Sequence, residues 1–167
     1  MKKGFTVVEI LVYVAVLAVV TGAVFSFLLW TSQSQVVVSS QRRLSIVASQ
    51  ALELLSKEAR EARSVYDSTS LYASSPGQLS LETTKDLPEG ETETFVDFFL
   101  CGSELCMKKE GASPLALTPS EVSIDSLVFT KVVSGNVPSL KVDISLSFKD
   151  AQLDISQTVS LRTYVAP

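Results

Sequence analysis

The sequence predicts an α+β protein in which one long N-terminal helix precedes an antiparallel β-rich region. Residues 10–30 carry no charge, and residues 31–75 contain neither proline nor glycine, which favours a single continuous helix. After Tyr66 the pattern changes, because apolar residues begin to alternate with polar ones. Such alternation is typical of strands with one buried and one solvated face. We therefore expect a helix packed on an antiparallel sheet.

The apolar segment 10–30 is long enough to cross a membrane. Its 21 residues, at a helical rise of about 1.5 Å each, match a hydrocarbon core of about 30 Å. Lys2 and Lys3 precede the segment, which predicts a cytoplasmic N-terminus and a head outside. Glu9 is the only charged residue between Lys3 and Arg42. A carboxylate at the edge of a membrane span is costly, so Glu9 needs a partner.

The first residues, Met-Lys-Lys-Gly-Phe-Thr-Val-Val-Glu, resemble the processing site of type IV prepilins and of the pseudopilins of type II secretion. The basic leader, with Lys2 and Lys3, ends at Gly4. The resemblance implies that a prepilin peptidase cuts between Gly4 and Phe5 and methylates Phe5. It also implies that Glu9, the fifth residue after the cut, pairs with the N-terminal amine of a neighbouring subunit.

Two other interpretations of this segment remain open. A secretory signal has an apolar core of about 7 to 15 residues, whereas this core is longer and follows an acid. A plain signal anchor would tolerate Glu9 near the interface, because acids close to the end of a span reach the headgroups. Either would give the same orientation as the prepilin interpretation.

These features divide the chain into four parts. They are a leader at 1–4, a transmembrane and filament-core helix at 5–30, an amphipathic stalk helix at 31–66, and a β-rich head at 67–167. Residues 67–167 carry seven basic side chains against fourteen acidic ones. We expect no direct contact with nucleic acid, since such contacts depend on clustered Lys and Arg.

The stalk is predicted to bury one face against the head. Seven residues recur at helical spacings of three and four, namely Leu44, Ala48, Ala51, Leu55, Ala59, Ala62 and Tyr66. Its charged residues lie largely off that face: Arg42, Arg43, Glu53, Lys57, Glu58, Arg60, Glu61 and Arg63. These charges form either a solvated surface or a basic stalk that meets the acidic head of a neighbour.

The membrane segment lacks one feature of the family that it resembles. Major pilins usually have a helix-kinking proline in the second half of the span, and here that region contains Gly22 and no proline. This departure favours a minor pilin or a pseudopilin. A single glycine weakens a helix by about 1 kcal/mol relative to alanine but removes no hydrogen bond.

The head is predicted to be a meander of strands. We expect strands at 78–84, 94–101, 122–133, 140–148 and 153–165, with an exposed loop at 85–93 and turns at 134–138 and 149–150. This layout of a long helix followed by a sheet is also what the pilin resemblance implies. The order of the last strands looks most like that of the larger minor pseudopilins of the J type.

Cys101 and Cys106 enclose four residues, 102–105. A tight hairpin would place the two cysteines opposite each other at a separation that suits a disulfide, and an exported head permits oxidation. A pair of free thiols is the alternative. A metal site is disfavoured, because no other cysteine and no histidine is present.

The acidic residues of the 85–93 loop, Asp86, Glu89, Glu91 and Glu93, form either a solvated loop or a Ca²⁺ site without EF-hand spacing. The absence of histidine excludes Ser-His and Cys-His nucleophile pairs. We find no catalytic constellation, and we expect no metal and no cofactor.

The sequence thus predicts a non-enzymatic structural subunit, a minor pilin or pseudopilin anchored in the cytoplasmic membrane and then assembled into an extracytoplasmic filament. The resemblance implies four partners: a prepilin peptidase, other pilin or pseudopilin subunits, an inner-membrane assembly platform and the lipid bilayer. The machine served, whether for secretion, DNA uptake, adhesion or twitching, is left open. The alternative is a membrane-tethered binding module that captures a ligand through its sheet and through Phe98 and Phe99 without polymerising.

Overall fold

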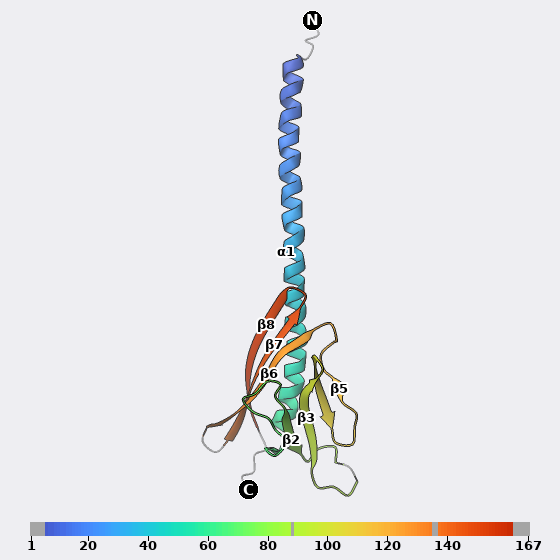
Figure 1. The fold of residues 1–167 in the computed structure, drawn as a ribbon, viewed down its shortest axis with the longest axis vertical. Coiled ribbons are helices and arrows are strands. Elements are labelled where there is room, and N and C mark those ends of the chain that lie inside the picture. The colour runs from blue at the N-terminus through green and yellow to red at the C-terminus, as the bar shows by residue number, and fades with distance from the viewer. Residues whose placement is uncertain (1–5, 88, 135–136, 162–167) are drawn as a thin grey trace. The chain divides into compact units, whose positions relative to one another are not determined.

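The predicted α+β class is confirmed (Figure 1). The computed structural model describes residues 6–87, 89–134 and 137–161, without the side chains of 32–37, 133, 134, 137 and 138. Within these ranges the chain forms one helix and eight strands. They are α1 (Val7–Glu61), β1 (Ser64–Val65), β2 (Leu79–Thr83), β3 (Thr94–Cys101), β4 (Glu104–Lys109), β5 (Leu115–Ala116), β6 (Ser123–Ser134), β7 (Val137–Phe148) and β8 (Ala151–Ser160).

The chain divides into two compact units, Met1–Ser39 and Ser40–Pro167, with the boundary inside α1. In the second unit, the C-terminal part of α1 supplies one face of the core. The predicted face is buried from Leu44 to Ala62. Four of its residues are alanines, Ala48, Ala51, Ala59 and Ala62, whose small side chains let the strands approach the helix closely.

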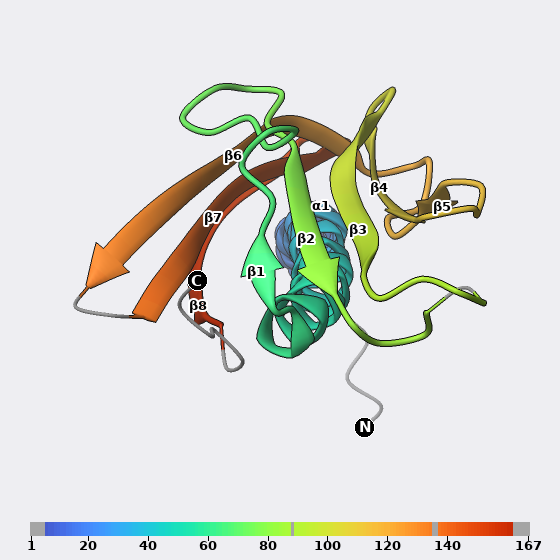
Figure 2. The ribbon, with the colours of Figure 1, turned by 90° about the horizontal axis from the view of Figure 1, so that it is seen from below.

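The head contains two antiparallel sheets, so the expectation of a single sheet is wrong. The first has the order β1-β2-β3-β4-β5 and the second the order β6-β7-β8. Both sheets contribute to the core, with Phe98 from β3 and Phe129 from β6 as its largest fully buried side chains. Figure 2 shows the two sheets arranged around the C-terminal part of α1. Alternation along a strand predicts which face is buried but not which strand is the neighbour.

The helix ends at Glu61, before the predicted limit at Tyr66. Ala62 N–H still donates to Glu58 O, at 2.9 Å, but Arg63 N–H donates to Glu82 O of β2 at 2.8 Å. The chain therefore leaves the helix to pair with β2, and Tyr66 lies beyond the helix, where its ring contacts Phe95 with 4.9 Å between centroids.

The five predicted strands are present with limits that agree to within a few residues, apart from the end of the last one, whereas β1, β4 and β5 were not predicted. The predicted turn at 134–138 is too wide, because Ser134 pairs with Val137 and Val133 with Pro138. Proline is accommodated in β7 since pairing with β8 begins only at Ser139, so Pro138 has a partner strand on one side. The last strand begins at Ala151 and ends at Ser160, and residues 162–165 of its predicted range lie outside the described residues.

Candidate functional site

The start of α1 is fixed by Thr6. Its Oγ1 accepts a hydrogen bond from Glu9 N–H at 3.3 Å, and its carbonyl accepts from Glu9 N–H at 3.1 Å and from Ile10 N–H at 3.3 Å. The sequence Thr6-Val-Val-Glu9 has the Ser/Thr-x-x-Glu spacing of a capping box, which marks this helix start in the sequence. Glu9 lies in the first turn, where the helix dipole favours negative charge.

The residues predicted for processing, Lys2, Lys3, Gly4 and Phe5, lie outside the described residues. Glu9 is described and exposed, and its carboxylate has no ion pair with any other described residue. The partner that a carboxylate at this depth requires is therefore not supplied by the described part of the chain.

The segment Val7–Thr31 of α1 is a continuous apolar helix. It has 25 residues, and its most apolar 18-residue stretch has a mean hydropathy of 2.5, so by length and composition it is able to cross a membrane. None of its most apolar stretch is buried within the protein, and its large side chains are exposed. An apolar surface of this extent needs lipid or other apolar helices to cover it.

Two threonine hydroxyls within this segment are hydrogen-bonded inside the helix. Thr21 Oγ1 donates to Leu17 O, and Thr31 Oγ1 donates to Phe27 O at 2.9 Å. Such bonds to the preceding turn remove the cost of placing a hydroxyl in hydrocarbon. The helix is unbroken at Gly22, where an added Cβ would meet no atom within 4 Å.

Half of the charged residues predicted for the stalk pair with the head of the same chain. Four contacts connect α1 or the residues just after it to the strands and loops: Arg43–Glu121 at 2.5 Å, Glu61–Lys85 at 2.5 Å, Arg63–Glu82 at 3.7 Å and Glu58–Lys109 at 3.9 Å. The hydrogen bond from Lys85 lowers the pKa of Glu61, and the same bond raises the pKa of Lys85. The side chains of the Arg43–Glu121 and Glu61–Lys85 pairs are largely solvated, so these two pairs contribute little to stability. The carboxylates of Glu58 and Glu82 are more buried, but their contacts are longer.

Cys101 and Cys106 form a disulfide, with their Cα atoms 5.9 Å apart. The hairpin loop has two residues rather than the predicted four, because Cys101 pairs with Glu104 and Cys106 pairs with Phe99. The cysteines are therefore diagonal rather than opposite. Gly102 has a φ of 74° at the first loop position, which is what a type II′ hairpin turn requires.

The aromatic pair beside this hairpin is not a binding surface as a whole. Phe98 is completely buried in the core, and only Phe99 is partly accessible. The proposed role of both rings in a non-polymerising binding module is therefore wrong for Phe98. Alternation along β3 explains the difference, since neighbouring residues face opposite sides of the sheet.

The acidic loop gives no indication of a metal site. Asp86 accepts a hydrogen bond from Lys109 at 3.4 Å. Within the described ranges, no group of three or more potential metal-ligating side chains is close enough to hold an ion.

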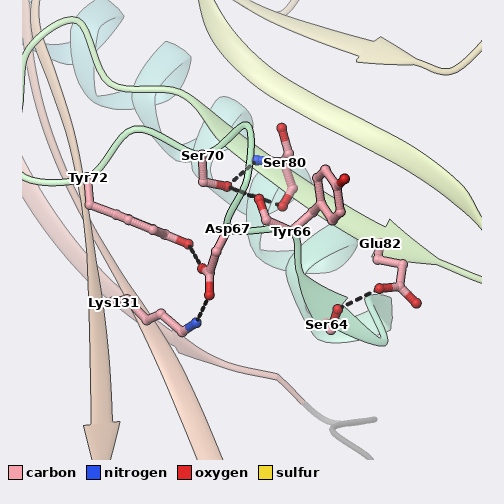
Figure 3. Close-up of polar contacts among 8 residues, drawn as sticks. All are labelled: Ser64, Tyr66, Asp67, Ser70, Tyr72, Ser80, Glu82 and Lys131. Carbon is pink, nitrogen blue, oxygen red and sulfur yellow. Dashed lines mark hydrogen bonds and ion pairs between the residues drawn. The ribbon is translucent and has the colours of Figure 1, made fainter. Parts of the chain in front are cut away.

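A polar cluster connects the two sheets, and the sequence did not reveal it (Figure 3). Lys131 of β6 donates to Asp67 at 2.6 Å, and Tyr72 donates to the other oxygen of Asp67 at 2.7 Å. Ser70 Oγ accepts from Ser80 N–H of β2 at 3.0 Å and donates to Tyr66 O at 2.8 Å. The segment between β1 and β2 thus contacts both sheets.

The cluster shifts the titration of two of its members. Burial raises the pKa of Asp67, but the hydrogen bonds from Lys131 and Tyr72 outweigh it, so the net pKa lies below its ordinary value. Burial, together with the neighbouring Asp67 carboxylate, raises the pKa of Tyr72. Asp67 therefore stays charged and Tyr72 stays protonated, which preserves both bonds at neutral pH.

Comparison with known proteins finds a family match for the N-terminal part of this chain. Residues 1–25 match the family model described as the prokaryotic N-terminal methylation motif. No curated protein and no solved structure matches the chain. The matched residues include the leader, Glu9 and the beginning of the exposed apolar helix. The chain therefore carries the type IV prepilin and pseudopilin signature, an N-terminal methylation motif followed by an apolar helix.

Proposed function

We propose that the chain is a structural minor pilin or pseudopilin. A prepilin peptidase removes residues 1–4 and methylates Phe5, and the apolar helix then packs into the core of a filament or pseudopilus. The observation that carries the proposal is the exposed apolar helix Val7–Thr31 with the carboxylate of Glu9 in its first turn. This surface requires apolar neighbours, and this acid requires a cation.

In the filament, Glu9 pairs with the N-terminal amine of an adjacent subunit. The amine is charged at neutral pH, and the pair neutralises both groups when they leave the bilayer for the filament core. The role of the subunit is minor rather than major because α1 has no proline and continues straight through Gly22. The remainder of the chain is the extracytoplasmic head.

The first experiment is the intact mass of the chain expressed with and without a prepilin peptidase. We expect the loss of Met1 through Gly4 and the gain of one methyl group on Phe5. An unchanged mass beside an active peptidase would indicate a signal anchor, and a cut near Thr31 would indicate an ordinary exported domain. Both outcomes contradict the proposal.

The second experiment separates processing from assembly. Glu9→Gln and Glu9→Val should be cut and methylated like the wild type but should be absent from sheared filaments or pseudopili. Glu93→Gln is the matched control, because it removes a carboxylate from an exposed position in the head. Normal incorporation of the Glu9 variants would contradict the assembly role of Glu9. Absence of the wild-type chain from filaments, with no co-purifying pilin-like chains, would favour the non-polymerising binding module instead.

A further inference from the structure

The two edges of the three-stranded sheet differ in their hydrogen bonding. The edge of β6 is covered by the segment before β2: Ala73 N–H donates to Phe129 O at 2.9 Å, and Gly77 N–H donates to Leu127 O at 2.8 Å. Leu127 N–H in turn donates to Ser75 Oγ at 3.3 Å. The other edge is β8, and no strand among the described residues pairs with its outer side.

The register identifies the unpaired backbone groups of β8. Phe148 and Ala151 flank a two-residue turn, so they form a hydrogen-bonded pair, and bonded and non-bonded pairs alternate from there. The N–H and C=O groups that point away from β7 consequently belong to Gln152, Asp154, Ser156, Thr158 and Ser160. Lysine, proline and bulges usually protect such an edge, and β8 has none of them.

A groove runs beside this edge, between β8 and the C-terminal part of α1. Its volume is about 830 Å³, and its walls include Leu54 and Lys57 of α1 and Ile155 of β8. Ser56 also lines it and is only 6% exposed. Its hydroxyl is the one buried side-chain N or O atom without a hydrogen-bond partner in the described part of the chain. A buried hydroxyl without a partner is costly, which points to a polar group that enters the groove.

The charges along the groove define what it accepts. On its helical wall, Glu53 and Lys57 are exposed four residues apart and offset each other, and Glu61 is engaged by Lys85 at 2.5 Å. The remaining charge on this wall is the exposed Arg60. The side chains of β8 on the inner face are Leu153, Ile155, Gln157 and Val159, and none of them is acidic. A second β8 paired edge to edge would therefore bring no counter-charge to Arg60. The complementary occupant is a different strand that carries a carboxylate.

We propose that β8 is a docking edge for an extended, acidic segment of a partner polypeptide. The segment adds as a fourth strand to the backbone groups of residues 152–160. Its inward side chains are apolar against Leu54 and Ile155, with one carboxylate directed at Arg60 and one polar group at Ser56. Main-chain bonds give affinity in this mode and side-chain pockets give specificity.

The test uses the full chain in detergent micelles and an acetylated octapeptide of alternating valine and threonine with one central glutamate. Amide exchange on β8 should alternate before the peptide is added, with 153, 155, 157 and 159 protected. Millimolar peptide should slow amide exchange at 154, 156 and 158 by at least about tenfold. This is the protection expected when the peptide concentration is about ten times the dissociation constant. Exchange that stays unchanged, or slows equally on β3 and β4, overturns the proposal.

Three variants sharpen the result. Ser156→Pro removes an outward N–H that β7 does not use, so it should abolish binding while thermal unfolding stays close to that of the wild type. Ser56→Ala should raise the melting temperature yet weaken binding. Arg60→Glu should reduce the affinity for the glutamate peptide about tenfold and should bind a peptide with lysine in place of glutamate as tightly as the wild type binds the original. The control Arg42→Glu lies outside the groove and should leave the affinity for either peptide unchanged. Equal affinity in all variants contradicts the proposal, and none of these measurements depends on cleavage or on filaments.

Discussion

Lys131 Nζ lies 2.6 Å from Asp67 Oδ2, although 64 residues separate them in the chain. Asp67 follows β1 of the five-stranded sheet, and Lys131 belongs to β6 of the three-stranded sheet. The pair therefore connects the first loop of the head to its second sheet. Tyr72 holds the other carboxylate oxygen, so the acid is oriented from two sides.

This pair predicts an acid-sensitive component of stability. The pKa of Asp67 is lowered on folding, so its contribution is present above the unfolded value of about 4 and is lost as pH falls through the folded value. Asp67 is 58% exposed, so the effect should be at most about 1 kcal/mol. Chemical denaturation measures the free energy of unfolding at pH 7 and at pH 2. Its decrease on acidification should be smaller in Asp67→Asn than in the wild type, while Glu93→Gln behaves as the wild type. Identical profiles for all three would contradict the assignment.

Gly77 is predicted to tolerate no side chain. A Cβ at this position would lie 3.0 Å from both Leu127 O and Phe129 Cδ2, and the first of these atoms is backbone that cannot move cheaply. We expect Gly77→Ala to lower the free energy of unfolding by about 1 to 3 kcal/mol, the usual range for overpacking. Urea denaturation measures this, with the exposed neighbour substitution Ser74→Ala as control. A variant as stable as the wild type would mean that the segment shifts without cost.

The disulfide should stabilise a hairpin rather than the whole head. Only four residues lie between Cys101 and Cys106, so closing the loop contributes on the order of 2 kcal/mol at most. The double variant Cys101→Ala, Cys106→Ala should exchange amides faster within β3 and β4 and should leave β6 to β8 unchanged. Reduction of the wild type should reproduce this pattern. Loss of protection throughout the head would show that the bond has a larger role.

Thr6 is predicted to be required for an ordered first turn. Thr6→Ala removes the side-chain acceptor of Glu9 N–H and should cost about 1 kcal/mol, whereas Thr6→Ser keeps the oxygen and should behave as the wild type. Amide exchange at Val8, Glu9 and Ile10 in micelles is the measurement. Equal exchange in the two variants would mean that water or detergent caps the helix equally well.

Local sequence patterns were sufficient to predict those structural features that depend on residues close together in the chain. The limits of β3 were predicted residue for residue, because Phe98 and its alternating neighbours bury one face. The methylation motif could be recognised for the same reason, since its residues are adjacent in the chain. The end of the helix was missed, because Ala62 continues the apolar spacing while the backbone of Arg63 already pairs with Glu82.

Features that depend on distant segments could not be predicted. The contact between Asp67 and Lys131 exists only because β6 passes the loop after β1, and nothing in the periodicity of either segment indicates this. The unpartnered hydroxyl of Ser56 likewise has no signature, since a serine on the edge of a buried helical face is common. The division into two sheets also escaped prediction, because strand partners depend on the path of the whole chain.

The unequal edges of the head have a consequence for how such molecules aggregate. Polymers that grow by adding strand to strand need two accessible edges on every molecule. Here residues 73–77 cover the edge of β6 at Leu127 and Phe129, and β1 and β5 have two residues each. Among the described strands only β8 offers a long accessible edge, so a head can accept one strand and is then saturated. In the filament proposed above, unlimited growth would come from the apolar helix alone, and the crowded heads would be protected from amyloid-like assembly.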